Sequence, residues 1–376
     1  MAFQRRGRLS TAPFRADHVG SLLRPHELHE LRENVRLGKA SLSKLKQAED
    51  RLIRDAVKLQ EDLGLQAITD GEFRRDWWHI DFLAGFDGVT LKYDEGDAYH
   101  GTQFKGTEAK PPTMFVTGEL RRTKPSMVPH FEFLKSVVKK GTPKFTMPSP
   151  AMLHARGDRD SIRETYPNSD NFWADLTQCY REEIADLYKA GCRYLQIDDT
   201  TIAMMGDPEV QESFRKLGDD PKKDTAMYAE AINMAIRDVP DDMTVAVHTC
   251  RGNFKSTWLA SGSYDYVAET AFSKIDVDGF FLEFDDERSG GFEPLRYVPK
   301  GKKVVLGLVS SKLPQLEKKD DLKRRIEAAS KFVPMEYLCL SPQCGFSSTH
   351  HGNNLTVDEE KAKLKLCIDT AREVWG

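Results

Sequence analysis

The sequence predicts an α/β fold, a single (β/α)8 TIM barrel, and three observations support this fold class. Short apolar runs alternate along the chain with longer amphipathic segments, which is the order of β/α units. The phrases LGLQAITD and AGCRYLQIDD both run from a helix end through a glycine to a buried strand and an acidic residue. A length of 376 residues suits one large barrel with an insertion. We therefore expect residues 1–376 to form one domain. We also expect its sheet to close into a barrel rather than to stay open.

Eight strands are expected in chain order, at residues 14–19, 66–69, 144–147, 194–197, 244–247, 279–282, 303–308 and 337–340. The strongest helical patterns between them cover residues 43–63, 171–190, 224–237 and 357–374. Ser41 and Asp170 are predicted N-caps, because their side chains can accept from unpaired backbone donors. Gly64 and Gly191 are predicted to end helices in the left-handed conformation.

One stretch, residues 86–128, interrupts this alternation. It is rich in Gly, Thr, Lys and Pro, contains the strand-like pieces GVTLKY and TMFVTGEL, and is too long for an ordinary loop. It predicts a β-hairpin inserted after the second strand. Such a hairpin can cover the barrel mouth, contact a neighbouring subunit in a homodimer, or have no functional role.

Composition excludes several classes of protein. The net charge is −4 and the acidic and basic residues are interleaved, which argues against a nucleic-acid partner. No run approaches the ~20 apolar residues that span a bilayer, and the first residues lack the apolar core of a secretory signal. Six cysteines without such a signal indicate a reducing cytoplasm. We expect a cytoplasmic protein with small-molecule partners and no membrane association.

Residues able to bind metals or substrates follow the predicted strands. In a TIM barrel, catalysis takes place at the carboxyl ends of the strands. The polar residues at these ends are Ser21, Glu72, Asp198, His248, Cys250, Glu283 and Cys344. We therefore expect the active site to lie at the carboxyl ends of the predicted strands.

The H-x-C pair formed by His248 and Cys250 is the first sign of a metal site. Alternate residues of a strand point the same way, so the two side chains can face one point. Cys344 and Glu283 can converge on that point across the barrel mouth, and such a donor set suits Zn²⁺. Alone, H-x-C is a weak signal that more often means a packed histidine and cysteine. Its place at a strand end, together with a second strand-end cysteine and a glutamate, favours the metal.

These motifs resemble the cobalamin-independent methionine synthase family, in its C-terminal catalytic barrel, and within it the short single-barrel members of the methyltetrahydropteroyltriglutamate–homocysteine methyltransferase-like type. The resemblance covers nearly the whole chain, through FRADHVGSLLRP, ITDGEFRR, LQIDD, HTCRGNF, DGFFLEFDDERSGGF, LGLVSSK and LCLSPQCGFSST. It implies a zinc-dependent methyltransferase whose metal ligands are His248, Cys250, Glu283 and Cys344.

The resemblance also implies a substrate site. Glu72 and Asp198 are expected to be the catalytic acids that hold the amino group of homocysteine, and Val19, Gly20 and Ser21 its carboxylate-binding turn. The simpler alternatives are that Asp198 caps a helix and that Gly20 only turns the chain. Zinc coordination removes the thiol proton, and the sulfur then displaces a methyl group from its donor. Glu283 is expected to yield its place on the metal, because carboxylate binds zinc less tightly than thiolate.

Two departures from the family leave the donor open. Longer members carry an additional N-terminal barrel that helps to bind polyglutamyl folate, which this sequence lacks. They also carry a histidine after the seventh strand, where GLVSSKLPQLE has Val309 at or near the matching position, beside Ser310 and Ser311. A folate leaving group needs a proton, for which His79, His350 and His351 are alternatives, although we expect each of them to be a surface residue. A methylated corrinoid needs no such acid.

Two other functions stay open at this point. Epoxyalkane:coenzyme M transferases share the H-x-C…C pattern, but the sulfonate of coenzyme M requires cations, for which Arg15, Arg24, Arg74 and Arg75 are available. Glu72 and Asp198 favour an amino-acid thiol such as homocysteine instead. A non-catalytic zinc- or thiol-binding protein would use close ligand pairs, whereas these ligands come from separate strands. The aromatic residues near the motifs either stack on a flat donor or pack in the core: Trp77, Trp78, Phe284 and Phe346.

Overall fold

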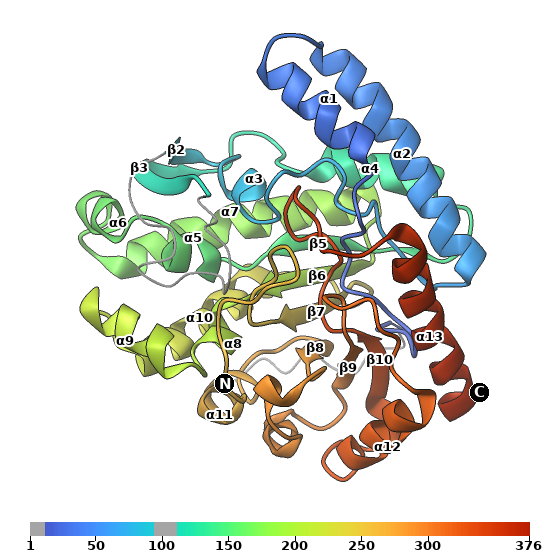
Figure 1. The fold of residues 1–376 in the computed structure, drawn as a ribbon. Coiled ribbons are helices and arrows are strands. Elements are labelled where there is room, and N and C mark those ends of the chain that lie inside the picture. Colours follow the sequence, from blue (N-terminus) through green and yellow to red (C-terminus); the bar gives the residue numbers. More distant parts are fainter. Residues whose placement is uncertain (1–11, 94–110) are drawn as a thin grey trace.

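The computed structural model describes residues 12–93 and 111–376. At its centre lies a six-stranded parallel sheet in the order β10-β9-β8-β7-β6-β5, surrounded by helices (Figure 1). Its strands are β5 (Phe145–Pro148), β6 (Tyr194–Asp199), β7 (Thr244–Thr249), β8 (Gly279–Glu283), β9 (Lys303–Val309) and β10 (Leu338–Pro342). All six coincide with predicted strands to within a few residues.

The remaining two barrel positions join the ends of this sheet. β1 (Ala67–Ile68) pairs in parallel with β4 (Thr142–Pro143), which leads directly into β5. The first predicted strand, residues 14–19, forms isolated bridges instead: Ala16 with Leu340 on one side and Ser21 with Gly71 on the other. Its chain therefore lies between the last strand and the loop after β1. These findings confirm the α/β barrel fold.

A side chain explains why residues 14–19 do not form a regular strand. The buried Asp17 carboxylate accepts the backbone N–H groups of Phe14 at 3.1 Å and His18 at 2.8 Å. Those donors are therefore not used in a strand ladder. Lys144 compensates the charge, with Nζ 3.1 Å from Asp17 Oδ1, and Tyr194 donates to Oδ2 at 2.8 Å.

Thirteen α-helices lie in the described part of the chain. They are α1 (His26–Arg36), α2 (Leu42–Leu63), α3 (Ile80–Leu83), α4 (Val128–Val137), α5 (Ala151–Arg156), α6 (Arg159–Thr165), α7 (Ser169–Ala190), α8 (Thr201–Met204), α9 (Pro208–Lys216), α10 (Pro221–Ile236), α11 (Asp265–Ala271), α12 (Lys319–Ala329) and α13 (Val357–Trp375). Short 3₁₀ turns cover Glu287–Ser289, Glu293–Tyr297 and Met335–Tyr337. None of these helices is long and apolar enough to cross a membrane.

Three of the four predicted helix ends are confirmed. Ser41 caps α2 by accepting from Lys44 N, and Gly64 and Gly191 end α2 and α7 with φ of 88° and 102°. The predicted N-cap Asp170 is wrong, because Asn168 caps α7 by accepting from Asp170 N. Asp170 lies instead in the first turn, where its negative charge favours the helix dipole.

The predicted hairpin is present as β2 (Asp87–Lys92) paired antiparallel with β3 (Thr113–Arg121). Its described part lies beside α6 at the edge of the molecule (Figure 1). Thr165 Oγ1 donates to the Val116 carbonyl, and Leu120 N donates to the Tyr166 hydroxyl. The described residues of the hairpin therefore flank α6, and the stretch 94–110 lies outside the described residues.

The interior of the barrel sets the direction of the site residues. The apolar side chains inside the ring form one cluster: Ala12, Phe14, Val19, Ala67, Tyr194, Ala246, Phe281, Val305 and Cys339. Because strand residues alternate between faces, the inward positions continue from Tyr194 to Asp198, from Ala246 to His248 and from Phe281 to Glu283. The strand pattern thus directs three predicted site residues into the barrel mouth.

Candidate functional site

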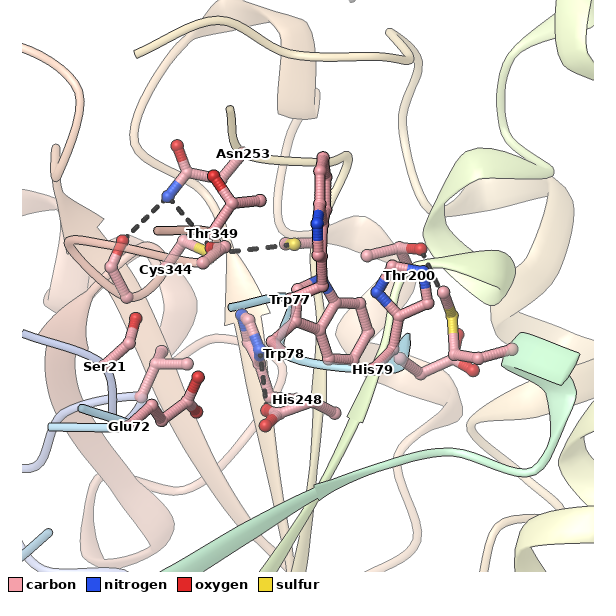
Figure 2. Close-up of a pocket in the computed structure, with 18 of the residues that line it drawn as sticks. Ser21, Glu72, Trp77, Trp78, His79, Thr200, His248, Asn253, Cys344 and Thr349 are labelled. Atoms are coloured by element: carbon pink, nitrogen blue, oxygen red, sulfur yellow. Dashed lines mark hydrogen bonds and ion pairs between the residues drawn. The ribbon is translucent and has the colours of Figure 1, made fainter. Parts of the chain in front are cut away.

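The predicted site residues surround one pocket at the carboxyl end of the sheet (Figure 2). The pocket encloses about 650 Å³, including space open to solvent at its mouth. Seven predicted residues line it: Val19, Ser21, Glu72, Asp198, His248, Cys250 and Cys344. Gly20 and Glu283 are not among the lining residues. Gly20 has φ of 144° and its α-hydrogen faces Thr146, where a Cβ would lie 2.7 Å from Cγ2.

Three side chains form a compact group that can hold a metal ion. The ligand atoms of His248, Cys250 and Cys344 lie within 4.8 Å of one another, and all three residues are buried. The two sulfurs are 3.7 Å apart. Two thiolates at Zn–S distances of about 2.3 Å on a tetrahedral ion would lie about 3.8 Å apart. The donor set and the sulfur separation therefore fit zinc.

Hydrogen bonds define the electrostatics of this group. The hydrogen bond between Cys344 and Cys250 and the bond with His248 hold the pKa of Cys344 well below its usual value, against the effect of burial. The same pairing with Cys344, together with burial, raises the pKa of Cys250. Burial opposes protonation of His248, but its bonds with Asp198 and Cys344 raise its pKa to about 10. The group thus stabilises a thiolate even before it binds a cation.

Asp198 contacts His248 as well as lining the pocket. Its Oδ1 lies 3.2 Å from His248 Nδ1 and accepts from Gln196 Nε2 at 2.6 Å. An Nδ1–H bond to this carboxylate leaves Nε2 of the imidazole for a metal, as is usual for metal-binding histidines. Nε2 lies 3.3 Å from the Gln343 carbonyl. The predicted helix-capping role belongs to Asp199, which accepts from Ile202 N at 2.7 Å.

Glu72 faces the same pocket from a strained loop. Its φ of 61° lies in the left-handed region, which costs a non-glycine residue about 1–3 kcal/mol. Asp70 Oδ1 accepts from Glu72 N at 2.9 Å, and Arg24 Nη2 donates to the Glu72 carbonyl at 3.1 Å. Thr146 Oγ1 donates to Oε1 at 2.8 Å. Burial raises the pKa of Glu72, Arg75 lowers it and the nearby Asp198 carboxylate raises it.

The turn at Val19 to Ser21 is fixed by its carbonyl groups. Gln196 Nε2 donates to the Val19 carbonyl at 2.7 Å, and Thr69 Oγ1 donates to the Gly20 carbonyl at 2.6 Å. Within the described residues, no protein group accepts from the backbone N–H of Gly20 or Ser21. The turn thus keeps backbone donors available beside the pocket.

Glu283 is the predicted metal ligand that the compact group does not include. Its carboxylate is fully buried and accepts from Arg251 N at 2.8 Å and Gln343 Nε2 at 3.1 Å. Arg288 Nη2 lies 3.5 Å and Lys312 Nζ 3.8 Å from Oε1. Burial alone would raise the pKa of Glu283, but Lys312 and Arg251 hold it below its usual value. The residue is therefore an anion surrounded by cations.

The other side of the pocket has a different character. In Figure 2, Ser21 and Glu72 lie on one side, His79 and Thr200 on the other, with Trp77 and Trp78 between them. We call the first side the Cys344 end (Ser21, Glu72, Asp198, His248, Cys250 and Cys344) and the second the His79 end (His79, Met152, Arg156 and Thr200). Trp77 and Trp78 thus line the pocket, whereas Phe284 and Phe346 are buried outside it.

His79 is buried in the pocket wall, which corrects the expectation that it is a surface residue. Its exposed fraction is 6%, and its Nδ1 is buried with no hydrogen-bond partner within the described residues. Burial, with the nearby Arg156, lowers its pKa to about 3. Neither His350 nor His351 lines the pocket; their ring centroids lie 3.8 Å apart beside Trp77.

None of the four arginines named for a sulfonate lines the pocket, and each has a partner within the protein. Arg24 joins Ser347 Oγ to the Glu72 carbonyl, and Arg75 Nη2 donates to the Thr146 carbonyl. Arg74 pairs with Glu49, and Arg15 donates to the Leu338 carbonyl. Arg156 is the single Arg or Lys among the described lining residues.

Sequence reasoning missed Gln343 and Lys312. Both contact Glu283, although they are 60 and 29 positions away along the chain. The available signals were their places next to predicted motifs, Gln343 just before Cys344 and Lys312 just after the seventh strand. Neither residue type indicates a site without the folded geometry.

Comparisons with known proteins agree with this site. The family model of the cobalamin-independent synthase catalytic domain matches residues 14–373. The uncharacterized protein YxjH of Bacillus subtilis is 45% identical over 376 residues, covering 100% of this chain and 98% of that protein. The crystal structure of a putative vitamin-B12 independent methionine synthase from Listeria monocytogenes is 38% identical, with a TM-score of 0.76, and covers 98% of this chain and 99% of that one.

A more distant structure shares the fold. The B12-independent methionine synthase of a Shewanella species, in complex with selenomethionine, is 20% identical with a TM-score of 0.70, covering 96% of this chain and 97% of that one. The family match spans both halves of the barrel, including the strand ends that carry His248, Cys250 and Cys344. The chain therefore belongs to the cobalamin-independent methionine synthase family of methyltransferases.

Proposed function

We propose that this protein transfers a methyl group to the thiol of homocysteine at a zinc site formed by His248, Cys250 and Cys344. One observation carries the proposal: the compact His/Cys/Cys group and the carboxylates of Glu72 and Asp198 open into the same pocket. A thiol substrate that also carries an ammonium group matches both features. Glu283 is the proposed exchangeable fourth ligand.

The residues of the chain have separate tasks in this reaction. Bound zinc supplies the positive charge that keeps the substrate sulfur deprotonated. Glu72 and Asp198 bind the ammonium group, since two neighbouring buried carboxylates favour a cation between them. The N–H groups of Gly20 and Ser21 donate hydrogen bonds to the substrate carboxylate. These contacts hold the substrate sulfur in a fixed position relative to the methyl donor, which lowers the entropic part of the activation barrier for methyl transfer.

We propose a methylated folate or a methylated corrinoid as the donor. Trp77 and Trp78 offer flat faces to either ring system. His79 is neutral at physiological pH because its pKa is about 3, so it can form a hydrogen bond with the donor but is a poor source of a full proton. A folate donor would therefore need another acid. Parallel activity assays with a methylated folate and with a methylated corrinoid show which of them is the donor.

The alternative reactions have less support. Coenzyme M would place a sulfonate where Glu72 and Asp198 stand, and Arg156 lies at the His79 end instead. A non-catalytic zinc protein would not need a substrate-sized pocket beside its metal group. The expected homodimer stays a prediction, which sedimentation of the full chain tests.

Metal content by plasma emission tests the proposal, on wild type, Cys344→Ser and the control Cys339→Ser. Cys339 is equally buried on β10 but faces the barrel interior. We expect about one zinc per chain in wild type and control, and much less in Cys344→Ser. X-ray absorption should show one additional sulfur ligand when homocysteine is added. Wild type that takes up no zinc under reducing conditions would overturn the mechanism.

A further inference from the structure

Arg75 is a buried cation that contacts Glu72 from outside the pocket. Its side chain is only 1% exposed and does not line the pocket, whereas Glu72 does. Arg75 Nη1 lies 3.5 Å from Glu72 Oε1, three positions away along the chain. Within the described residues, Nε and Nη1 of Arg75 have no hydrogen-bond partner. The contact between the two side chains is therefore an ion pair without a hydrogen bond.

Strand β5 fixes both members of this pair. Arg75 Nη2 donates to the Thr146 carbonyl at 2.6 Å, and its guanidinium lies over the Phe145 ring, with Cζ 5.3 Å from the ring centroid. The Thr146 hydroxyl donates to Glu72 Oε1 at 2.8 Å. One residue of β5 thus holds the arginine through its carbonyl and the carboxylate through its hydroxyl. The geometry of the pair is set before any substrate arrives.

The charged groups that face the Glu72 carboxylate have opposing effects. They are Arg75 on the same loop, Asp198 on β6 and Arg24. Burial raises the pKa of Glu72, Arg75 is the strongest influence that lowers it, and Asp198 raises it again. Arg24 acts more weakly and donates to the Glu72 carbonyl rather than to the carboxylate. Without Arg75, two buried carboxylates at one pocket would favour a shared proton.

We propose that Arg75 is a positioning residue that keeps the Glu72 carboxylate ionised and fixed at the pocket, which makes the site selective for a thiol carrying an ammonium group. The inference rests on the proposed function, in which Glu72 and Asp198 bind the amino group of homocysteine. A protonated Glu72 would present an O–H donor to a group that has only donors itself. Because Arg75 lies outside the pocket, it supports the charge without taking the place of the substrate.

Calorimetry with L-methionine, the product of the proposed reaction, tests this role. Methionine keeps the amino group but has no thiol, so no thiol proton enters its pH dependence. We expect Arg75→Met to bind methionine about tenfold more weakly than wild type near neutral pH, because Glu72 then keeps a proton. The ratio of the two affinities should shrink as the pH rises and Glu72 loses that proton. Arg75→Lys keeps the charge and should stay within about threefold of wild type.

Two controls separate this role from general damage. Arg159→Met is the matched variant, because Arg159 is also buried, lies over Phe214 at 5.3 Å and pairs with Asp219 outside the pocket. It should leave methionine affinity unchanged. The second control is a ligand without the amino group, 2-hydroxy-4-methylthiobutanoate, whose binding should not weaken in Arg75→Met.

Two further measurements do not depend on the single variant. In a Glu72→Gln background there is no charge to maintain, so Arg75→Met should cause no further loss of methionine affinity. Wild type should bind methionine without releasing a proton near neutral pH, which heats measured in two buffers of different ionisation enthalpy show. Release of about one proton would mean that Glu72 is protonated in the free protein and would overturn the inference.

The inference would also fail if Arg75→Met bound methionine like wild type, or if its deficit were constant with pH and equal for both ligands. These outcomes leave the proposed function standing. Wild type that binds neither ligand would overturn the proposed function and this inference together, which distinguishes the two failures.

Discussion

The two ends of the pocket differ in how their polar groups are paired. At the Cys344 end, Glu72 accepts from Thr146, and Asp198 joins Gln196 to His248. At the His79 end, the His79 Nδ1 has no partner within the described residues, and Thr200 and Arg156 donate to methionine sulfurs. Sulfur is a weak acceptor.

This difference indicates two kinds of recognition. A network whose members fix one another is preorganised for one ligand, and changing a member should cost affinity strongly. An unpaired imidazole nitrogen in the wall, such as His79 Nδ1, costs stability in the free protein and gains a partner only when a ligand arrives. The Cys344 end should therefore select homocysteine, while the His79 end should contribute more modestly, through the donor.

The largest expected effect concerns Glu72. Glu72→Gln removes a buried charge opposite the ammonium group and should weaken homocysteine binding about 100-fold, or about 2–3 kcal/mol. Calorimetry with homocysteine and with 4-mercaptobutyrate, which lacks the amino group, measures it. Glu49→Gln is the control, because Glu49 is a buried carboxylate paired with arginines outside the pocket. An equal loss for both thiols would show that Glu72 does not bind the amino group.

Asp198→Asn should have the next largest effect, on the metal rather than the substrate alone. The substitution weakens the acceptor of His248 Nδ1, which typically costs 10- to 100-fold in metal affinity. Competition with a chelator measures zinc affinity, and Glu72→Gln should leave it unchanged. If both substitutions lower zinc affinity alike, the Cys344 end acts as one network and the separate roles of its two carboxylates are refuted.

Much of the Cys344 end could be predicted because its signals are local. The alternation of apolar residues fixes which side chains of a strand face inward, so His248, Cys250 and Asp198 point into the mouth by periodicity alone. Chain reversal at Gly64 and Gly191 follows from the steric freedom of glycine. These features need no knowledge of distant segments.

The rest depends on contacts between distant segments, which local patterns do not encode. His79 is buried because the loop after β10 returns over it: Trp78 N donates to the Ser348 carbonyl and His350 N to the Asp76 carbonyl. Lys312 reaches Glu283 only through the neighbouring positions of β8 and β9. The irregular first strand follows from the Asp17 side chain, which competes with the backbone ladder.

A smaller effect is expected from His79→Phe. The phenyl ring removes the unpaired Nδ1, so transfer from a productive donor should slow about tenfold, while homocysteine affinity stays unchanged. Steady-state kinetics with the methylfolate or methylcorrinoid that supports turnover separates the two. His351→Gln is the control, since His351 does not line the pocket. A loss of homocysteine affinity in His79→Phe would remove the distinction between the two ends.

The smallest effect is on the pH dependence of stability, and it reports the burial of His79 without any ligand. The pKa of His79 is about 3 in the folded protein against 6.5 for an exposed histidine, so between these values the unfolded chain binds more protons. The contribution of the neutral His79 imidazole to the free energy of unfolding is therefore fully present above pH 6.5 and is lost as the pH falls below that value. Between pH 6.5 and 5.5, wild type should lose about 1 kcal/mol more than His79→Phe in urea unfolding.

The difference between the two proteins isolates this residue from other titrating groups. His18, whose pKa burial lowers to about 4, contributes equally to both stability curves and cancels. Any constant gain or loss from packing a phenyl ring shifts one curve without changing its slope. Parallel curves would mean that His79 gains its proton in the folded protein as readily as in the unfolded chain. The imidazole would then be hydrated or paired, and the contrast between a satisfied Cys344 end and an unsatisfied His79 end would fail at its central residue.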